Sequence, residues 1–399
     1  LLTSKNGQPK NYFQISCCPW CGSSLINLEN NEIGFKKEIK RKFYIKCLNK
    51  NCEYSNILPV QVVDEMLYEN PPTLLIATID KFALLVKKEK ARAFFGLGNN
   101  NLPPELIIQD ELHLISGPLG SMFGIYESVF DYLCQNNGSN AKIISSTATI
   151  KQANVQIKNL FHRNSFLFPP PGIEIEDSFF AKEKKIDENN LGRLYCGIIN
   201  IGITASTAIV RILATLLYYN IEFSRFIQKE EIFDYNNYYT IVGYFNSLKE
   251  LGIASSLLAD DVEGRYQQIE VRNGFLIPRE KKYCELTSRL NDDEIPKILY
   301  ELETTTNYSI VLASNMLSVG IDISKLNIMF MQNQPKSNSE YIQATSRVGR
   351  QVPGVIFTLY NYFRPRDKSY FENFKSFHQS FYRFVEPTSA TPFSLPARK

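Results

Sequence analysis

An apolar run in this sequence ends in two adjacent carboxylates. Residues 106–113 read LIIQDELH, so Asp110 and Glu111 follow four residues typical of a buried strand. The carboxyl end of a strand is where an α/β sheet places its ligand-binding groups, and Mg²⁺ prefers hard oxygen ligands such as carboxylates. A lone acidic pair is more often an ordinary strand end that faces a loop, so its interpretation depends on the rest of the chain.

Three further segments with polar, chemistry-bearing residues follow the acidic pair in order. They are SSTAT (145–149), at the end of the next predicted strand, ASNMLSVGIDIS (313–324) and QATSRVGR (343–350). Their order and spacing carry more information than any one of them.

Together these segments resemble the motifs of the superfamily 2 DExH helicases. DELH looks like motif II, SSTAT like motif III, ASNMLSVGID like motif V and QATSRVGR like motif VI, while VGYFNS (242–247) lies where motif IV belongs. The resemblance covers residues 59–160 and 190–365. It implies that the chain is the C-terminal part of an ATP-dependent helicase or translocase.

The resemblance also implies a role for each matching residue. Asp110 would hold Mg²⁺ through water, and Glu111 would orient and polarise the water that attacks the γ-phosphate. Arg347 and Arg350 would neutralise charge on the phosphoryl oxygens, and Gln343 would contact the γ-phosphate or the water. A second group, His113, Ser146 and Thr147, would couple the nucleotide state to lobe movement. Gly320 and Asp322 would lie beside the ATP cleft, with Asp322 near the ribose.

In this family both lobes hold the nucleic-acid strand mainly by its backbone. TIDKF (78–82) matches a strand-end motif of that kind, and ELTSR (285–289) lies between motifs IV and V. Each hydroxyl among the candidates is as typical of a helix cap or a surface position. The candidates are Thr78, Lys81, Ser247, Thr287, Arg289, Ser314 and Asn315.

The sequence departs from the family pattern in two mild ways and one serious way. Ser346 stands where motif VI has Gly, and Ser314 stands where motif V commonly has Thr. The serious departure is that no G-x-x-x-x-G-K-[ST] loop, which would cradle the phosphates, occurs in the chain. We therefore expect the Walker A motif upstream of Leu1, and we expect this chain alone to be inactive as an ATPase.

A narrower resemblance concerns longer stretches. The cysteine segment, PPTLLIATIDKFALL, PPELIIQDELHLISGPLGS, FPPPG and GRLYCGI together look like the helicases of the DISARM antiphage-defence system and their relatives. This resemblance implies other defence subunits as partners and DNA, rather than RNA, as the target.

Five of the eight cysteines lie in residues 17–52. Cys18 and Cys21 form a C-x-x-C pair, and Cys47 and Cys52 form a C-x-x-x-x-C pair; two such pairs are typical of a closed structural Zn²⁺ site. Cys17 is an alternative ligand to Cys18. Between the pairs, FKKEIKRKFYIK (35–46) is either a nucleic-acid-binding stripe or the solvated edge of a β-ribbon.

Composition places the chain among ordinary proteins without a membrane span. It has 399 residues, 44% hydrophobic and 21% charged, with a net charge of +3 that is too small to indicate a nucleic-acid partner. It contains no apolar run long enough to span a membrane and no signal-peptide pattern. Clustered rather than spread cysteines favour a reducing compartment, so we expect a cytoplasmic location.

Short apolar runs alternating with helical patterns predict an α/β fold with two RecA-like parallel-sheet lobes, the first one incomplete, and a small zinc-ribbon insertion. The runs are TLLIA (73–77), ELIIQ (105–109), AKIIS (141–145), RLYCGI (193–198), YYTIVGYF (238–245), SIVLA (309–313), NIMFM (327–331) and GVIFTLY (354–360). We place the ribbon at 12–58, the first lobe at 59–170, a linker at 171–190, the second lobe at 191–385 and a loose tail at 386–399.

Two other hypotheses remain open at this point. The chain could be a non-motor nucleic-acid-binding or regulatory subunit without a P-loop, or a zinc-ribbon interaction protein whose lobes are scaffold. Glu111, Arg347 and Arg350 weigh against both, because neither role needs them.

Overall fold

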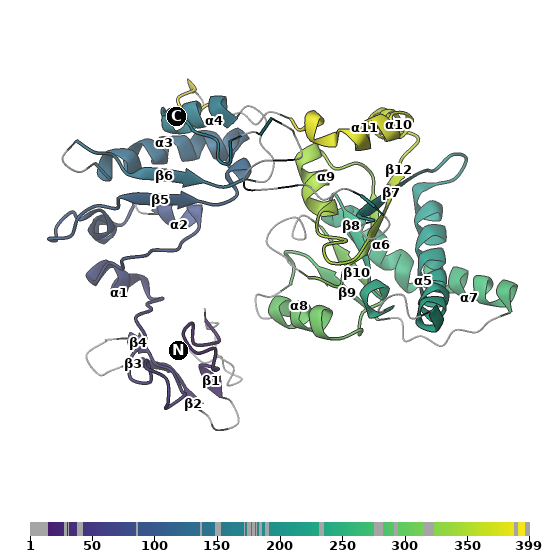
Figure 1. Ribbon diagram of the computed structural model, residues 1–399, viewed down its shortest axis with the longest axis horizontal. Helices are drawn as coiled ribbons and strands as arrows, with labels where there is room; N and C mark the ends of the chain where they lie inside the picture. Colours follow the sequence, from purple (N-terminus) through teal and green to yellow (C-terminus); the bar gives the residue numbers. More distant parts are fainter. Residues whose placement is uncertain are drawn as a thin grey trace. The chain divides into compact units, whose positions relative to one another are not determined.

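The structure is a computed structural model that divides into two compact units (Figure 1). Unit 1 comprises Leu1–Ala148, Gln152–Ser165 and Thr388–Lys399, and unit 2 comprises Thr149–Lys151 and Phe166–Pro387. The structure describes residues 15–27, 30, 32–37, 43–84, 87–135, 138–147, 153–170, 172–173, 177, 180, 182, 186–187, 191–230, 235–274, 282–290, 294–314, 323–386 and 390–395.

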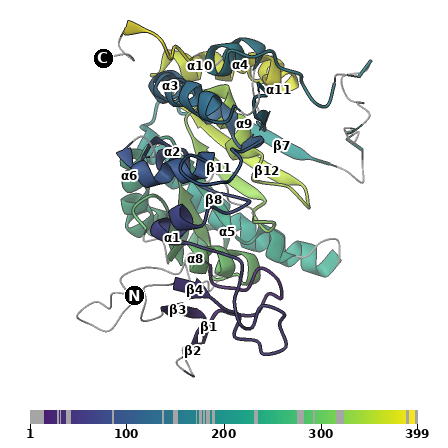
Figure 2. The same ribbon diagram turned by 90° about the vertical axis from the view of Figure 1, so that its left-hand side faces the viewer.

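Unit 2 is built on a parallel sheet of six strands in the order β7-β12-β11-β8-β10-β9. Figure 2 shows β7, β12, β11 and β8 side by side. The strands are β7 (Arg193–Ile199), β8 (Ile241–Phe245), β9 (Tyr283–Leu286), β10 (Ile310–Ala313), β11 (Ile328–Gln332) and β12 (Gly354–Tyr360).

Helices cover both faces of this sheet. They are α5 (Ala205–Glu230), α6 (Leu248–Ala259), α7 (Asp261–Asn273), α8 (Glu294–Thr304), α9 (Asn338–Thr345), α10 (Pro365–Glu372) and α11 (Phe374–Gln379), with 3₁₀ turns η4 (Tyr235–Tyr238) and η6 (Phe381–Phe384). Because successive strand side chains point to opposite faces, Ile241 and Phe245 of β8 pack with α5, α6 and α7, whereas Val242 and Tyr244 pack with α8, α9 and α11. Burial on both faces explains why β8 and β10 read as continuous apolar runs.

Unit 1 contains the parallel pair β5 (Leu106–Gln109) and β6 (Lys142–Ser145), with α3 (Gly117–Leu133) packed against α4 (Ala153–Phe161). Ile108 is 65% exposed and Ile144 is 46% exposed, as expected of a lobe whose sheet is incomplete. The remaining elements are β1 (Ile26–Asn27), β2 (Glu32–Ile33), β3 (Phe35–Lys37), β4 (Phe43–Ile45), α1 (Asp64–Glu69), α2 (Ile79–Leu84), η2 (Glu89–Phe95) and η3 (Leu112–Leu114).

Two predictions from the sequence are wrong. TLLIA (73–77) is not a strand, because no described strand pairs with it, and Leu74 and Ile76 are exposed. The tail is not loose over residues 390–395. Ala390 is 1% exposed, and the Thr391 amide donates to Ser121 Oγ on α3 at 3.0 Å. Pro392 packs close to α3 because residue 124 is glycine. A Cβ at this position would lie only 2.5 Å from the Pro392 side chain.

Within the described residues, no helix is long and apolar enough to cross a membrane.

Candidate functional site

The carboxyl ends of β5 and β6 bring the acidic pair next to the SSTAT segment. The parallel register pairs Gln109 with Ser145, so Asp110 and Ser146 are the next residues on the two strands. The Ser146 hydroxyl donates to Asp110 Oδ1 in a short hydrogen bond. The backbone continues the contact, because the Leu112 amide donates to Ser146 O at 2.9 Å. The structure therefore joins the two segments that the sequence placed 36 residues apart.

Glu111 has an unusual backbone conformation for a residue with a side chain. Its φ is 54°, in the left-handed region, which costs roughly 1 kcal/mol outside Gly, Asn and Asp and concentrates at functional sites. The Glu111 amide donates to Asp110 Oδ1 at 3.0 Å. This turn ends β5.

His113 links Glu111 to the SSTAT segment. The imidazole is 8% exposed, and its Nδ1 lies 3.2 Å from Glu111 Oε2 and 3.2 Å from Thr147 Oγ1. Asp110, Glu111, His113, Ser146 and Thr147 thus form one connected polar network at the sheet edge.

A second polar cluster lies beneath the acidic pair, and sequence reasoning missed it. Gln109 Nε2 donates to Glu127 Oε2 of α3 at 3.3 Å. Glu127 is 2% exposed. Its burial, with the nearby Asp131 carboxylate, raises its pKa to about 7, and the Arg163 guanidinium, paired with Asp131, opposes the shift. No spacing in the sequence could reveal this contact, since it depends on how α3 packs on β5.

Replacing Glu127 with Gln is expected to stabilise unit 1 at pH 8. Because the folded pKa is raised above the ordinary value near 4.5, the folded state binds more protons than the unfolded state, so stability falls as pH rises from about 4.5 to about 7. Glu127→Gln removes that loss, on the order of 2 kcal/mol. Urea unfolding of the 399-residue chain at pH 5 and pH 8 measures it, with exposed Glu65→Gln as the control. Equal effects of Glu127→Gln at both pH values would contradict the assignment.

In unit 2, the QATSRVGR segment forms the end of α9 and the turn that follows. Ser346 Oγ donates to Gln343 O at 2.9 Å, so the serine at the usual glycine position satisfies a carbonyl at the end of the helix. Arg347 is half-buried, whereas Arg350 is exposed and its Nε donates to Ser346 O at 3.4 Å. Gly349 has φ +68°, and a Cβ there would meet Gly354 at 2.7 Å, so the turn requires glycine.

Three candidate nucleic-acid contacts follow neighbouring parallel strands of unit 2. Ser247, Thr287 and Ser314 come after β8, β9 and β10, whose carboxyl ends share one sheet edge. Two hydroxyls are already used locally: Ser247 Oγ accepts from the Glu250 amide at 3.2 Å and caps α6, and Thr287 Oγ1 accepts from the Arg289 amide at 3.3 Å.

Two other candidates, Thr78 and Lys81, lie in unit 1, and three more lie outside the residues that the structure describes. Thr78 precedes α2, where its carbonyl accepts from the Lys81 amide at 3.0 Å, and Lys81 Nζ forms an ion pair with Asp64 at 3.1 Å. Asn315, Gly320 and Asp322 lie outside the described residues.

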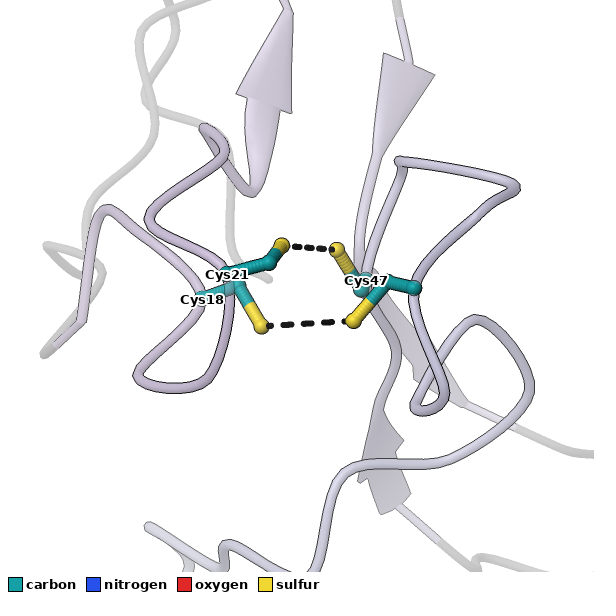
Figure 3. A group of neighbouring side chains, drawn as sticks. Cys18, Cys21 and Cys47 are labelled. Carbon is teal, nitrogen blue, oxygen red and sulfur yellow. Dashed lines mark hydrogen bonds between the residues drawn. The ribbon is translucent and has the colours of Figure 1, made fainter.

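Four cysteine thiols converge near the start of unit 1 (Figure 3). All four sulfur atoms lie within 4.8 Å of one another, with Cys18 Sγ 4.0 Å from Cys52 Sγ and Cys21 Sγ 3.5 Å from Cys47 Sγ. Tetrahedral Zn²⁺ with Zn–S bonds of 2.3 Å requires sulfur separations of about 3.8 Å, so the donor set fits Zn²⁺. Cys17 is exposed and pairs its backbone with Ser24 outside the cluster.

Comparisons with known proteins agree with this architecture. Residues 262–352 match the family described as helicase conserved C-terminal domain. DISARM protein DrmA of Bacillus paralicheniformis is 41% identical over 426 residues, covering 96% of this chain and 38% of that protein. The chain thus spans 38% of the length of this curated relative.

Two solved structures of the DUF1998 helicase MrfA show the same fold. The complex with DNA has a TM-score of 0.55 at 19% identity, covering 84% of this chain and 39% of that one. The complex with DNA and AMPPNP has a TM-score of 0.52 at 17% identity, covering 84% and 41%. The predicted resemblance to helicases of the DrmA type is confirmed, as is the α/β fold of two RecA-like lobes.

Proposed function

We propose that this chain is the C-terminal part of an ATP-driven helicase or translocase that acts on DNA in antiphage defence. The observation that carries the proposal is the network joining Asp110, Glu111 and His113 to Ser146 and Thr147. The two carboxylates contact different partners, Asp110 the Ser146 hydroxyl and Glu111 the His113 imidazole, as two separate tasks in hydrolysis would require. The DrmA-like sequence supports the defence context.

In this proposal the two carboxylates have separate tasks. Asp110 would hold Mg²⁺, which would neutralise charge at the phosphates. Glu111 orients the attacking water and takes its proton. The Ser146 hydroxyl fixes Asp110, and His113 holds Glu111 and Thr147 together, so a change at the phosphates reaches the loop after β6.

Phosphate binding needs groups beyond those in this chain. No G-x-x-x-x-G-K-[ST] occurs in its 399 residues, and in a protein of the relative's length that cradle would come from outside them. Arg347 and Arg350 supply positive charge for the transition state, with Gln343 at the γ-phosphate. These groups belong to unit 2, whereas the two carboxylates belong to unit 1.

The remaining partners follow from the same proposal. Cys18, Cys21, Cys47 and Cys52 would hold Zn²⁺ in a structural role, because a site with four protein ligands would leave no position for a substrate. The strand-end hydroxyls of unit 2 are proposed to contact the phosphate backbone of the strand. DNA is proposed because the MrfA structures with this fold are DNA complexes, and other DISARM subunits are proposed as protein partners.

Arg347→Ala tests the proposal in the full-length gene product. We expect the rate of DNA-stimulated ATP hydrolysis to fall about 10³-fold, the effect typical of losing a transition-state arginine. Arg272→Ala, an exposed arginine at the end of α7, is the control and should retain the wild-type rate. ATP hydrolysis that survives Arg347→Ala would contradict the proposed role of motif VI.

A further inference from the structure

α9, which carries Gln343 and leads to Arg347, is held at both ends by residues outside the helicase motifs. At its C-terminal end, Arg193 of β7 donates Nε to Val348 O at 2.5 Å and Nη2 to Ser346 O at 3.1 Å. At its N-terminal end, the Asn338 amide donates to the Glu386 carboxylate at 2.8 and 3.1 Å. Each charge has the sign that the helix dipole favours at that end.

A third attachment holds the middle of the helix. The Tyr341 ring is fully buried, and its hydroxyl lies 2.8 Å from His378 Nε2 of α11. His378 Nδ1 lies 2.8 Å from Phe374 O. A carbonyl oxygen only accepts, so Nδ1 carries the hydrogen and Nε2 of the neutral ring accepts from Tyr341. Burial lowers the pKa of His378, which favours this neutral form.

Close packing keeps His378 in place. Its ring centroid lies 4.0 Å from that of Phe374 and 4.8 Å from that of Tyr195 on β7. Gly197 of β7 permits this arrangement, because a Cβ there would lie 2.8 Å from the Phe374 ring. The aromatic segment around α11 thus supplies one polar acceptor to a buried hydroxyl that requires one.

We infer that His378 is a positioning residue for motif VI: by accepting the Tyr341 hydrogen bond, it fixes α9 and therefore the direction in which Gln343 and Arg347 leave it. The inference rests on the proposed function for the roles of Gln343 and Arg347. The hydrogen bond itself does not. A position error of about 1 Å at a catalytic group can cost 10²-fold in rate, so a contact remote from the phosphates can still govern turnover.

Three variants separate positioning from packing. His378→Phe keeps a ring and removes the acceptor, His378→Gln keeps an acceptor near the Nε2 position, and Tyr341→Phe removes the donor. In the full-length gene product we expect His378→Phe and Tyr341→Phe each to lower kcat for ATP about tenfold, with KM nearly unchanged. His378→Gln should recover most of the rate. The double variant with both phenylalanines should be no slower than either single one. Exposed Lys375→Ala on α11 is the control.

Amide hydrogen exchange in the 399-residue chain provides a readout independent of activity. His378→Phe should speed exchange at Tyr341–Val348 about tenfold and leave α5 unchanged. Wild-type kcat in His378→Phe, alongside loss of activity in Arg347→Ala, would overturn the inference and leave the proposed function intact. If the wild type hydrolyses no ATP, the proposed function is overturned, and amide exchange in His378→Phe still tests the contact between His378 and Tyr341. Faster exchange at Tyr341–Val348 would support that this contact fixes α9, and unchanged exchange would overturn it.

Discussion

Glu111→Gln is expected to lower the kcat of DNA-stimulated ATP hydrolysis by about 10²–10⁴-fold in the full-length gene product, because the amide cannot accept the proton of the attacking water. The shape of the side chain is preserved, and an amide oxygen can still approach His113, which lies 3.2 Å from Glu111 Oε2. ATP binding should therefore remain. Fluorescent-nucleotide titration and steady-state hydrolysis measure the two properties separately.

Glu105→Gln is the matched control for this substitution. Glu105 is an exposed carboxylate just before β5, six residues from Glu111 and outside the polar network. Its loss should leave hydrolysis at the wild-type rate. A Glu111→Gln protein that hydrolyses ATP at the rate of the Glu105→Gln protein would exclude Glu111 as the base. Loss of nucleotide binding in Glu111→Gln would instead indicate a structural role for the residue.

Removing Zn²⁺ is expected to unfold the cysteine module of residues 15–58. Its apolar core is small, with Leu25, Phe35, Ile45 and Leu58 packed beside three of the thiols. Structural zinc in small modules contributes roughly 10–16 kcal/mol, far more than such a core supplies. Cys47→Ser, or treatment with a chelator, should release one Zn²⁺ per chain and abolish hydrogen-exchange protection within the module.

Cys17→Ser provides the control, because Cys17 is exposed and lies outside the four-sulfur cluster. This variant should retain one Zn²⁺ per chain and wild-type protection. Retention of zinc by Cys47→Ser with no change in protection would contradict the four-cysteine site. Zinc loss from Cys17→Ser would place the first ligand one residue earlier than the geometry does.

The strands of unit 2 could be predicted from the sequence because the sheet is covered on both faces. β8 and β10 are uninterrupted apolar runs, and β11 and β12 contain one polar residue each, Gln332 and Thr358, which is the composition typical of a doubly covered sheet. β9 was missed because YCEL has a charged residue and lies at the sheet edge, where burial constrains composition less. TLLIA (73–77) was wrongly predicted as a strand because it is apolar. An apolar run forms a strand only where a partner strand lies beside it, and no described strand pairs with this run.

The candidate site divides in the same way. Asp110 and Ser146 were both among the predicted site residues, and their contact follows from two strand ends in parallel register. The contacts of Glu127 and His378 depend on how α3 and α11 pack on residues 18 and 37 positions away. No periodicity encodes those contacts. Sequence reasoning therefore anticipated the groups proposed for the chemistry and missed those that support them.

We propose that the acidic network belongs to a nucleic-acid-driven ATPase. The most direct test is the steady-state rate of ATP hydrolysis by the full-length gene product, measured with and without single-stranded DNA, beside the 399-residue chain under the same conditions. We expect hydrolysis by the full-length protein that rises on adding DNA, and none by the 399-residue chain, which lacks a phosphate-cradling loop. No hydrolysis by the full-length protein at saturating DNA would contradict the account and favour a non-motor nucleic-acid-binding subunit.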